Sequence, residues 1–230
     1  MSPAFFSAGR ALNRPRFEPA NARAAGFTLM ELLAVIVVIA ILASLLFPAM
    51  RSVRTATAKA KTRVVFNQWT AAIENFRSEY GYYPALHSSN LVNPSGQNAD
   101  PATLHLFHDI LAAKRRDGSL LPAYVSSSDP RFPEVQNRRL VRFYVFGEGD
   151  FTSDNLLRDP CENTAVAVLV DKDLDGLIRA GTDFTTLPAV NGLTPSSSDF
   201  PAAGVRAGVV FYSASPNAAA TNPEFIFSWK

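Results

Sequence analysis

Residues 26–50 read GFTLMELLAVIVVIAILASLLFPAM, an apolar stretch whose single charged residue is Glu31. About 20 helical residues cross the roughly 30 Å hydrocarbon core of a bilayer, and residues 27–47 are long enough to do so. A carboxylate inside hydrocarbon is costly, so it marks a functional position that needs a partner. The sequence therefore predicts a single-pass transmembrane helix at residues 27–47 with an acid in its first turn.

A basic segment precedes the apolar stretch. Residues 1–25 hold four arginines, one acid and three prolines, a composition typical of a disordered leader. An ordinary secretory signal has a shorter apolar core followed by a small-x-small cleavage motif, and this stretch has neither. Basic residues also follow it at residues 51–63, so charge alone does not orient the chain in the membrane. On hydropathy alone, an uncleaved signal anchor is an equal alternative.

The overall composition excludes several functions. The chain has 230 residues, 18% of them charged, and a formal net charge of +2, which argues against an electrostatic nucleic-acid binder. Cys161 is the single cysteine, which excludes an intrachain disulfide and a cysteine metal site. We interpret the basic residues 51–63 as the solvated face of a helix near lipid headgroups rather than as a nucleic-acid patch.

Helical periodicity continues beyond the apolar stretch. Apolar residues recur at steps of three and four, at Val65, Trp69, Ile73, Phe76 and Tyr80. Gly81 and Pro84 supply stop signals. We expect one helix over residues 28–80, with a transmembrane half and a stem at residues 48–81. The stem's apolar face would pack on a soluble head domain at residues 82–230.

The head domain has the pattern of a small α+β fold. Residues 103–116 predict a second amphipathic helix, on which His105 and His108 have a spacing that could chelate a metal. No metal motif supports that reading, so we interpret both as surface histidines. Four short segments rich in Val and Phe predict a small antiparallel sheet, at residues 140–146, 165–170, 205–212 and 225–229. The predicted fold class is α+β, a long transmembrane-plus-stem helix packed on this sheet.

The Asp-rich segment 171–176 is a candidate metal site. Asp171, Asp173, Asp175 and Gly176 match the first half of an EF-hand loop, in which alternating carboxylates converge on calcium. The twelfth position of a full loop needs a bidentate acid and here is Thr182. The alternatives are a calcium-stabilised turn and a hairpin turn whose side chains cap their own backbone. A catalytic role for these carboxylates is a third alternative, but the sequence shows no nucleophile, base or oxyanion signature to support it. We therefore expect that the protein is not an enzyme.

The junction before the apolar stretch resembles the processing site of the type IV pilin and pseudopilin family. Gly26, Phe27 and Glu31 match it, and Pro48 falls where many pilins carry a helix-kinking proline. The resemblance implies that a prepilin peptidase removes residues 1–26 on the cytoplasmic side and that Phe27 becomes N-methylated. It also implies a protein of the bacterial inner membrane with its head domain in the periplasm.

The same resemblance supplies the missing partner of Glu31. Cleavage after Gly26 creates an α-amino cation on Phe27, and staggered helices in a filament can bring it to a neighbour's Glu31 carboxylate. Removing either partner would leave the other charge unpaired in an apolar setting. Glu31 is therefore predicted to be an assembly residue. The simpler alternative is an acid near the membrane edge whose head reaches the interface.

Parts of the head are similar to the major pseudopilins of type II secretion systems. The similarity involves residues 82–84, 158–163, 165–176, 212–217 and 227–229, and it does not cover residues 86–139. Cys161 and Glu162 replace a Trp-Gly pair, and Pro223 and Glu224 stand where that family has paired aspartates that help to hold calcium. These departures put the usual calcium site of the family in doubt.

These features together predict a structural pseudopilin subunit. Its expected partners are other pseudopilins in a periplasmic filament, the prepilin peptidase and an inner-membrane secretion platform, with calcium as the one candidate cofactor. One alternative is a type IV pilus subunit for adhesion, motility or DNA uptake. Another is a signal-anchored extracytoplasmic protein that only mimics the motif.

Overall fold

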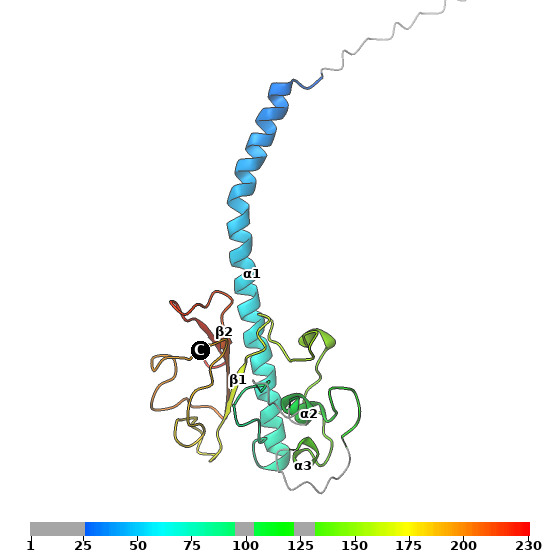
Figure 1. Ribbon diagram of the computed structural model, residues 1–230, viewed down its shortest axis with the longest axis vertical. Coiled ribbons are helices and arrows are strands. Elements are labelled where there is room, and N and C mark those ends of the chain that lie inside the picture. Colours follow the sequence, from blue (N-terminus) through cyan, green and yellow to red (C-terminus); the bar gives the residue numbers. More distant parts are fainter. Residues whose placement is uncertain (1–25, 95–103, 122–131) are drawn as a thin grey trace, which may run out of the picture. The chain divides into compact units, whose positions relative to one another are not determined.

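The computed structural model describes residues 26–94, 104–121 and 132–230, without the side chains of residues 45–49 (Figure 1). The chain divides into two compact units at Pro48 and Ala49. The predicted leader, residues 1–26, lies outside the described residues except for Gly26.

The helix α1 runs from Leu29 to Tyr80, 52 residues, and confirms the long helix predicted over residues 28–80. It ends where Gly81 adopts a φ of +82° and donates its backbone N–H to the Arg77 carbonyl at 2.7 Å. This left-handed conformation terminates helices and suits a residue without a Cβ. The stop signal read from the sequence therefore acts where it was expected.

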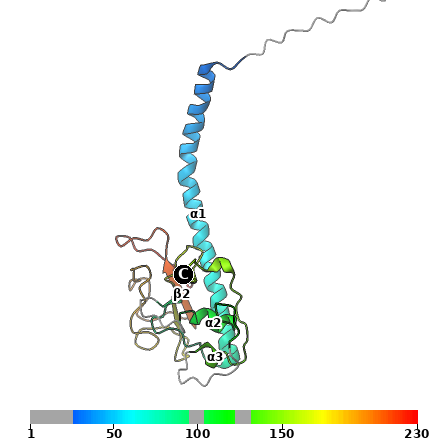
Figure 2. The same ribbon diagram turned by 45° about the vertical axis from the view of Figure 1, so that its right-hand side comes forward.

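A small antiparallel sheet lies beside the last part of α1 in both views (Figures 1 and 2). Its three strands are β1 (Ala167–Val170), β2 (Val209–Ala214) and β3 (Phe225–Phe227), in the order β1-β2-β3. The register pairs Val168 with Phe211 and Tyr212 with Phe227. The α+β class and the small antiparallel sheet are thus confirmed.

One face of the sheet packs against α1. Phe66 and Trp69 both contact Phe211 of β2, with ring centroids 5.6 Å apart in each pair. Ile73 and Phe76, further along the same helix face, are fully buried. Full burial of such a side chain contributes roughly 1.5–3 kcal/mol, so this seam is a major source of the unit's stability.

The other face of the sheet is also covered, which the strand predictions did not anticipate. Alternate residues of β1 and β2 point into a second core, among them Leu169 and Tyr212. The irregular segment between β1 and β2 supplies much of its cover, through Ile178, Phe184, Val190, Phe200 and Val205. β1 and β2 are therefore buried on both sides.

All four strand predictions differ in extent from the structure. Those at residues 165–170 and 225–229 are two residues longer than β1 and β3, and the other two differ more. Residues 140–146 form no strand. Their aromatic side chains pack on the core beside α1 instead, where Phe143 lies 5.4 Å from Phe76. Residues 205–212 contain a break, since Val205 forms an isolated bridge with Ile178 and β2 begins only at Val209. The break covers residues 206–208 and ends at Gly208, where a Cβ would stand 1.8 Å from the Tyr83 Oη.

The second helix is shorter than predicted. α2 spans Leu106–Ala112, all of it buried, and ends at Ala113 in a left-handed conformation. The short helix α3 (Pro133–Gln136) and the 3₁₀ turn η1 (Glu148–Asp150) were not predicted.

The interpretation of His108 as a surface residue was wrong. Its ring is buried, with its centroid 5.0 Å from that of Phe146 and 5.5 Å from that of Phe151. Its Nδ1 lies 2.8 Å from Asp109 Oδ1. Periodicity in the sequence did not show this, because both aromatic partners come from residues after the helix.

Candidate functional site

The predicted cleavage junction is exposed and precedes the helix. Gly26, Phe27 and Thr28 lie outside α1, and 80% of the Phe27 side chain is accessible. A Cβ added at Gly26 would have no atom of the described residues within 4 Å, apart from its chain neighbours. The peptide bond between Gly26 and Phe27 is therefore sterically open.

Glu31 is held at the first turn of α1 by Thr28. Glu31 Oε2 accepts the Thr28 backbone N–H at 2.9 Å and the Thr28 hydroxyl at 3.0 Å. In return the Thr28 Oγ1 accepts the Glu31 backbone N–H at 3.2 Å. This reciprocal pattern is a capping box, which satisfies amide groups that a helix start leaves unpaired.

The role of Thr28 was missed in the sequence, although the signal was present. The order Thr-x-x-Glu directly before an apolar run is the signature of a capping box, and residues 28–31 carry it. The helix dipole also favours a carboxylate at this end. Glu31 thus has a local structural role in addition to any contact with another subunit.

One oxygen of Glu31 stays available for a contact outside the subunit. Both contacts with Thr28 use Oε2, and no described residue hydrogen-bonds to Oε1. A carboxylate can accept several hydrogen bonds, so an amine could bind Oε1 without displacing Thr28. The arrangement fits the predicted assembly contact but does not itself contain the partner.

The apolar stretch around this site is exposed within its own unit. The large apolar side chains with high exposure there are Phe27, Leu29, Met30, Leu32, Leu33, Val35, Ile36, Val37, Val38, Ile39, Ile41 and Leu42. Exposed apolar surface of this extent marks a region that lipid or another protein covers. No helix within the described part of the chain has the length and apolarity that crossing a membrane requires. The transmembrane assignment of residues 27–47 stays a prediction.

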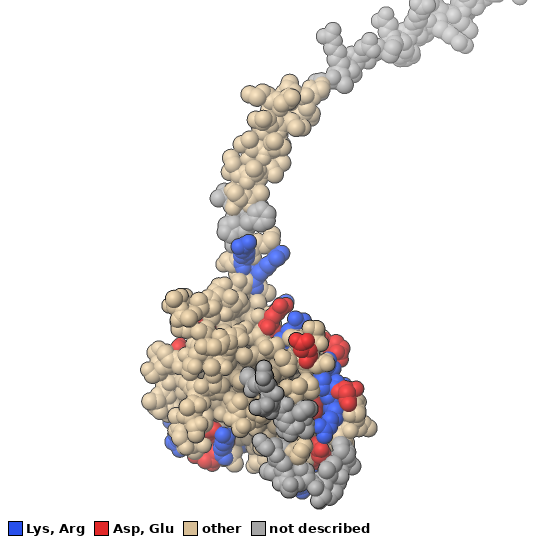
Figure 3. Space-filling model, in the orientation of Figure 1, with Lys and Arg blue, Asp and Glu red and all other residues tan. Residues whose placement is uncertain are grey.

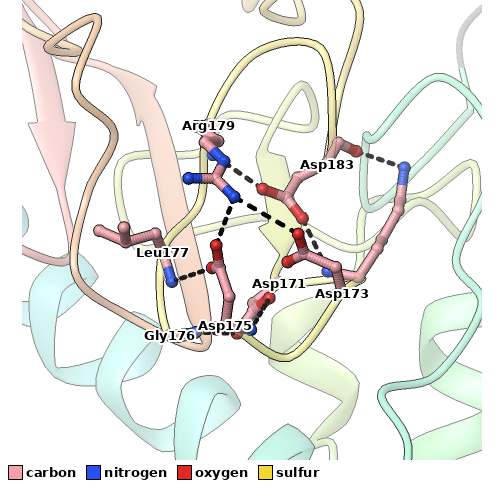
Figure 4. Close-up of polar contacts among 8 residues, drawn as sticks. Asp171, Asp173, Asp175, Gly176, Leu177, Arg179 and Asp183 are labelled. Carbon is pink, nitrogen blue, oxygen red and sulfur yellow. Dashed lines mark hydrogen bonds and ion pairs between the residues drawn. The ribbon is translucent and has the colours of Figure 1, made fainter.

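Asp171, Asp173 and Asp175 do come together in the turn after β1. One carboxylate oxygen from each lies within 4.8 Å of the others (Figure 4). Asp171 is buried and accepts the backbone N–H groups of Asp175 at 3.2 Å and Gly176 at 2.8 Å. Asp173 and Asp175 are exposed, so two of the three carboxylates face solvent.

A guanidinium supplies the positive charge of this turn. Arg179 NH2 lies 2.5 Å from Asp175 Oδ2 and 3.5 Å from Asp173 Oδ2 (Figure 4). Three carboxylates at this separation repel one another, and the arginine offsets that repulsion. The turn can therefore exist without a metal, and a cation bound by Asp173 and Asp175 would compete with Arg179.

Asp183 organises the same loop, a role that its place in the sequence did not indicate. Its side chain is buried, with Oδ1 accepting the Lys172 N–H at 2.7 Å and Oδ2 accepting the Arg179 N–H at 2.8 Å. Both oxygens are thus used by the backbone. Asp183 therefore does not serve as the bidentate metal ligand that an EF-hand loop has at its twelfth position, which here is Thr182.

Asp159 anchors the segment that contains Cys161. Its buried carboxylate accepts the backbone N–H groups of Cys161 and Asn163 and, at 2.6 Å, the hydroxyl of Ser213 in β2. Cys161 is half-buried, and desolvation raises the pKa of its thiol. Its Sγ accepts the Thr62 hydroxyl at 3.3 Å, so the residue packs against α1 rather than forming a reactive thiolate.

A second link to α1 lies just before β3. Lys59 Nζ donates to Glu224 Oε1 at 2.5 Å, and the Ser215 hydroxyl donates to Glu224 Oε2 at 2.8 Å. The hydrogen bond from Lys59 is the main cause of the lowered pKa of Glu224. An ion pair thus links the stem part of α1 to the segment just before β3.

A long helix packed on a small antiparallel sheet, with a Gly-Phe junction and a capped acid at the helix start, defines a pilin-like protein. Residues 21–47 match the family described as the prokaryotic N-terminal methylation motif. The match covers the N-terminal segment alone, a prepilin-type motif of the kind that type IV pilins and pseudopilins carry. It implies an inner-membrane-anchored prepilin, processing by a prepilin peptidase and pilus-like assembly. No curated protein and no solved structure matches the chain significantly.

Proposed function

We propose that the chain is a pseudopilin, a processed subunit that assembles into a short periplasmic filament of a type II-like protein secretion system. The observation that carries this proposal is the open Gly26-Phe27 junction with Glu31 held one turn beyond it. Members of this family are generally structural subunits without enzymatic activity. We extend that role to this chain, so that the force for secretion comes from other components of the inner-membrane platform.

Assembly would depend on a charge that the precursor lacks. Before cleavage the Phe27 nitrogen is an uncharged amide, and after cleavage it is an amine that carries a positive charge near neutral pH. This amine would pair with Glu31 of a neighbouring subunit through the Oε1 that Thr28 leaves available. Cleavage would then act as the switch that permits filament growth.

The resemblance of the head to major pseudopilins supports secretion over a pilus that mediates adhesion, motility or DNA uptake. Long pilins often close their C-terminal region with a disulfide, and the single Cys161 excludes an intrachain pair. Immunogold labelling of intact and permeabilised cells separates these functions. Labelling confined to the periplasm, with loss of exported protein on deletion, supports the pseudopilin. Long labelled surface fibres would support the pilus instead.

Mass spectrometry of the mature N-terminus tests the processing step itself. We expect a chain that begins at Phe27 with one methyl group on its amine. A mature chain that retains residues 1–26 would contradict both the pseudopilin and the pilus and would favour a signal-anchored protein.

We also propose that calcium binds weakly at the turn formed by Asp171, Asp173 and Asp175. The three carboxylates offer the hard oxygen ligands that calcium prefers, and Gly176 has a φ of +83°, which suits the sharp turn of such loops. Calcium would displace Arg179 from Asp173 and Asp175. The proposed role is stabilisation of the head domain rather than chemistry.

A further inference from the structure

The stem part of α1 carries an unusual excess of positive charge. Residues 32–73 contain five basic residues and no acid. Arg51, Arg54, Lys61 and Arg63 are exposed, and we call these four residues the basic collar. Lys and Arg side chains stand out in blue on the exposed part of α1 in Figure 3. Within the described structure, Lys59 is the one of these five that is paired, through its contact with Glu224.

The basic collar has no counter-charge among residues 26–94, 104–121 and 132–230. None of its four side chains forms an ion pair or hydrogen bond there, whereas many basic residues of the head do. A cluster of like charges on one helix repels itself and weakens folding slightly unless a partner compensates. The collar therefore points to a binding partner outside this folded unit.

We infer that the basic collar binds an anionic lipid surface, of which phosphatidylglycerol is the test case. This inference rests on the proposed membrane anchoring of residues 27–47. A helix advances about 1.5 Å per residue, so Arg51 and Arg54 follow Phe47 by about one and two turns. That separation places their side chains at the level of lipid headgroups. Lys61 and Arg63 lie further along and contribute a screened attraction.

A second copy of the chain matches the collar less well. The exposed acids described in the head are mostly engaged by their own chain, as Glu148 is by Arg116, Glu162 by Arg158 and Asp199 by Lys230. Much of the negative charge on the described surface is therefore already offset by a basic residue of the same chain. Lipid phosphates supply a continuous negative surface.

The collar also explains why basic residues occur on both sides of the apolar stretch. Basic residues favour the cytoplasmic side during insertion, so residues 51–63 oppose the predicted orientation. Their presence is accounted for if they hold the start of the stem at the headgroups. The stem would then keep a defined depth before a subunit is extracted into a filament.

The test uses the processed chain, residues 27–230, reconstituted into bilayers that contain spin-labelled phosphatidylglycerol or phosphatidylcholine. Electron paramagnetic resonance measures the fraction of each lipid immobilised by the protein. At 50 mM salt we expect preference for phosphatidylglycerol by about fivefold per contacting arginine, since one basic residue near the surface contributes about 1 kcal/mol. The preference should fall severalfold at 500 mM salt.

Variants assign the preference to the collar. Arg51→Gln with Arg54→Gln should remove most of it, and Arg51→Lys with Arg54→Lys should retain it. The matched control is Arg142→Gln with Arg206→Gln, two exposed head arginines without an ion pair in the described structure, and it should change nothing. An unchanged preference in the first variant, or none in the wild type, would overturn the inference.

Two further measurements keep the outcomes distinct. Flotation with phosphatidylcholine vesicles reports anchoring alone, and failure to float would refute the proposed anchoring rather than only the collar. Salt-sensitive self-association in pure phosphatidylcholine that disappears in the Arg51→Gln, Arg54→Gln variant would instead assign the collar to a second copy, and would overturn the lipid inference.

Discussion

Thr28 and Glu31 form a reciprocal pair that closes the start of α1, with the Thr28 hydroxyl 3.0 Å from Glu31 Oε2 and the Glu31 N–H 3.2 Å from Thr28 Oγ1. The pair places the one acid of the apolar stretch four residues after the predicted mature N-terminus. It also fixes the direction of the carboxylate, because both Thr28 donors hold the same oxygen. The local cap and the proposed assembly contact are therefore parts of one arrangement.

Glu31→Ala should separate processing from assembly. We expect normal removal of the leader, because the Gly26-Phe27 bond is exposed and independent of the cap. Filament assembly should fall at least tenfold, because the neighbour's amine loses its partner. Cross-linking and shearing of filaments measure assembly, and mass spectrometry measures cleavage. Normal incorporation of the variant into filaments would refute the pairing proposal.

Thr28→Val should weaken assembly less than Glu31→Ala does. The variant keeps the carboxylate and nearly the same side-chain volume, but it loses the hydroxyl that caps the helix. Loss of such a cap typically costs about 1 kcal/mol. Thr28→Ser retains the hydroxyl and is the matched control. Equal losses from Thr28→Val and Thr28→Ser would show that the cap is not involved.

The ion pair between Lys59 and Glu224 should make stability depend on pH. The pKa of Glu224 is lowered in the folded protein from a model-compound value of 4.5. Its contribution is therefore complete above pH 4.5 and is lost as the pH falls through the lower folded value.

A double-mutant cycle with Lys59→Met and Glu224→Gln isolates this pair. Chemical unfolding of the full chain in detergent should give a coupling free energy of about 1 kcal/mol or less at pH 7, as for other partly exposed pairs. The coupling should be smaller at pH 3. Coupling that is unchanged between these two pH values would contradict the assignment.

Gly208→Ala should destabilise the head domain. A Cβ there would lie 1.8 Å from Tyr83 Oη and 2.4 Å from Glu74 Oε1, so both side chains would have to move and the hydrogen bond between them would be disturbed. Overpacking of this kind typically costs about 1–3 kcal/mol. Gly149→Ala is the control, because nothing lies within 4 Å of the new methyl group. A melting temperature equal to that of the control would contradict the close approach.

Calcium binding at the Asp171 turn predicts a melting temperature that rises with calcium and falls with chelator. Asp173→Asn with Asp175→Asn should abolish the response. Arg179→Gln should enlarge it, because the competing guanidinium is gone. A melting curve that chelator leaves unchanged in both the wild type and Arg179→Gln would remove the proposed site.

Local signals in the sequence were sufficient for the long helix and its apolar face. Trp69, Ile73 and Phe76 were predicted from periodicity alone, and all three are buried. The convergence of Asp171, Asp173 and Asp175 was also predicted from local sequence, because a single turn brings alternate residues close together. The Thr28 cap was also readable, although it was missed.

Tertiary structure decided the features whose partners lie far apart in the chain. Residues 140–146 have the composition of a strand, but packing on α1 outweighed β propensity. Lys59 meets Glu224 across 165 positions, and no periodicity reports such a contact. The sequence by itself thus determined the helix, because its information is local, and the processing junction stays a prediction. Only the fold decided which charges are paired, and so which ones, at the basic collar, are left for a partner.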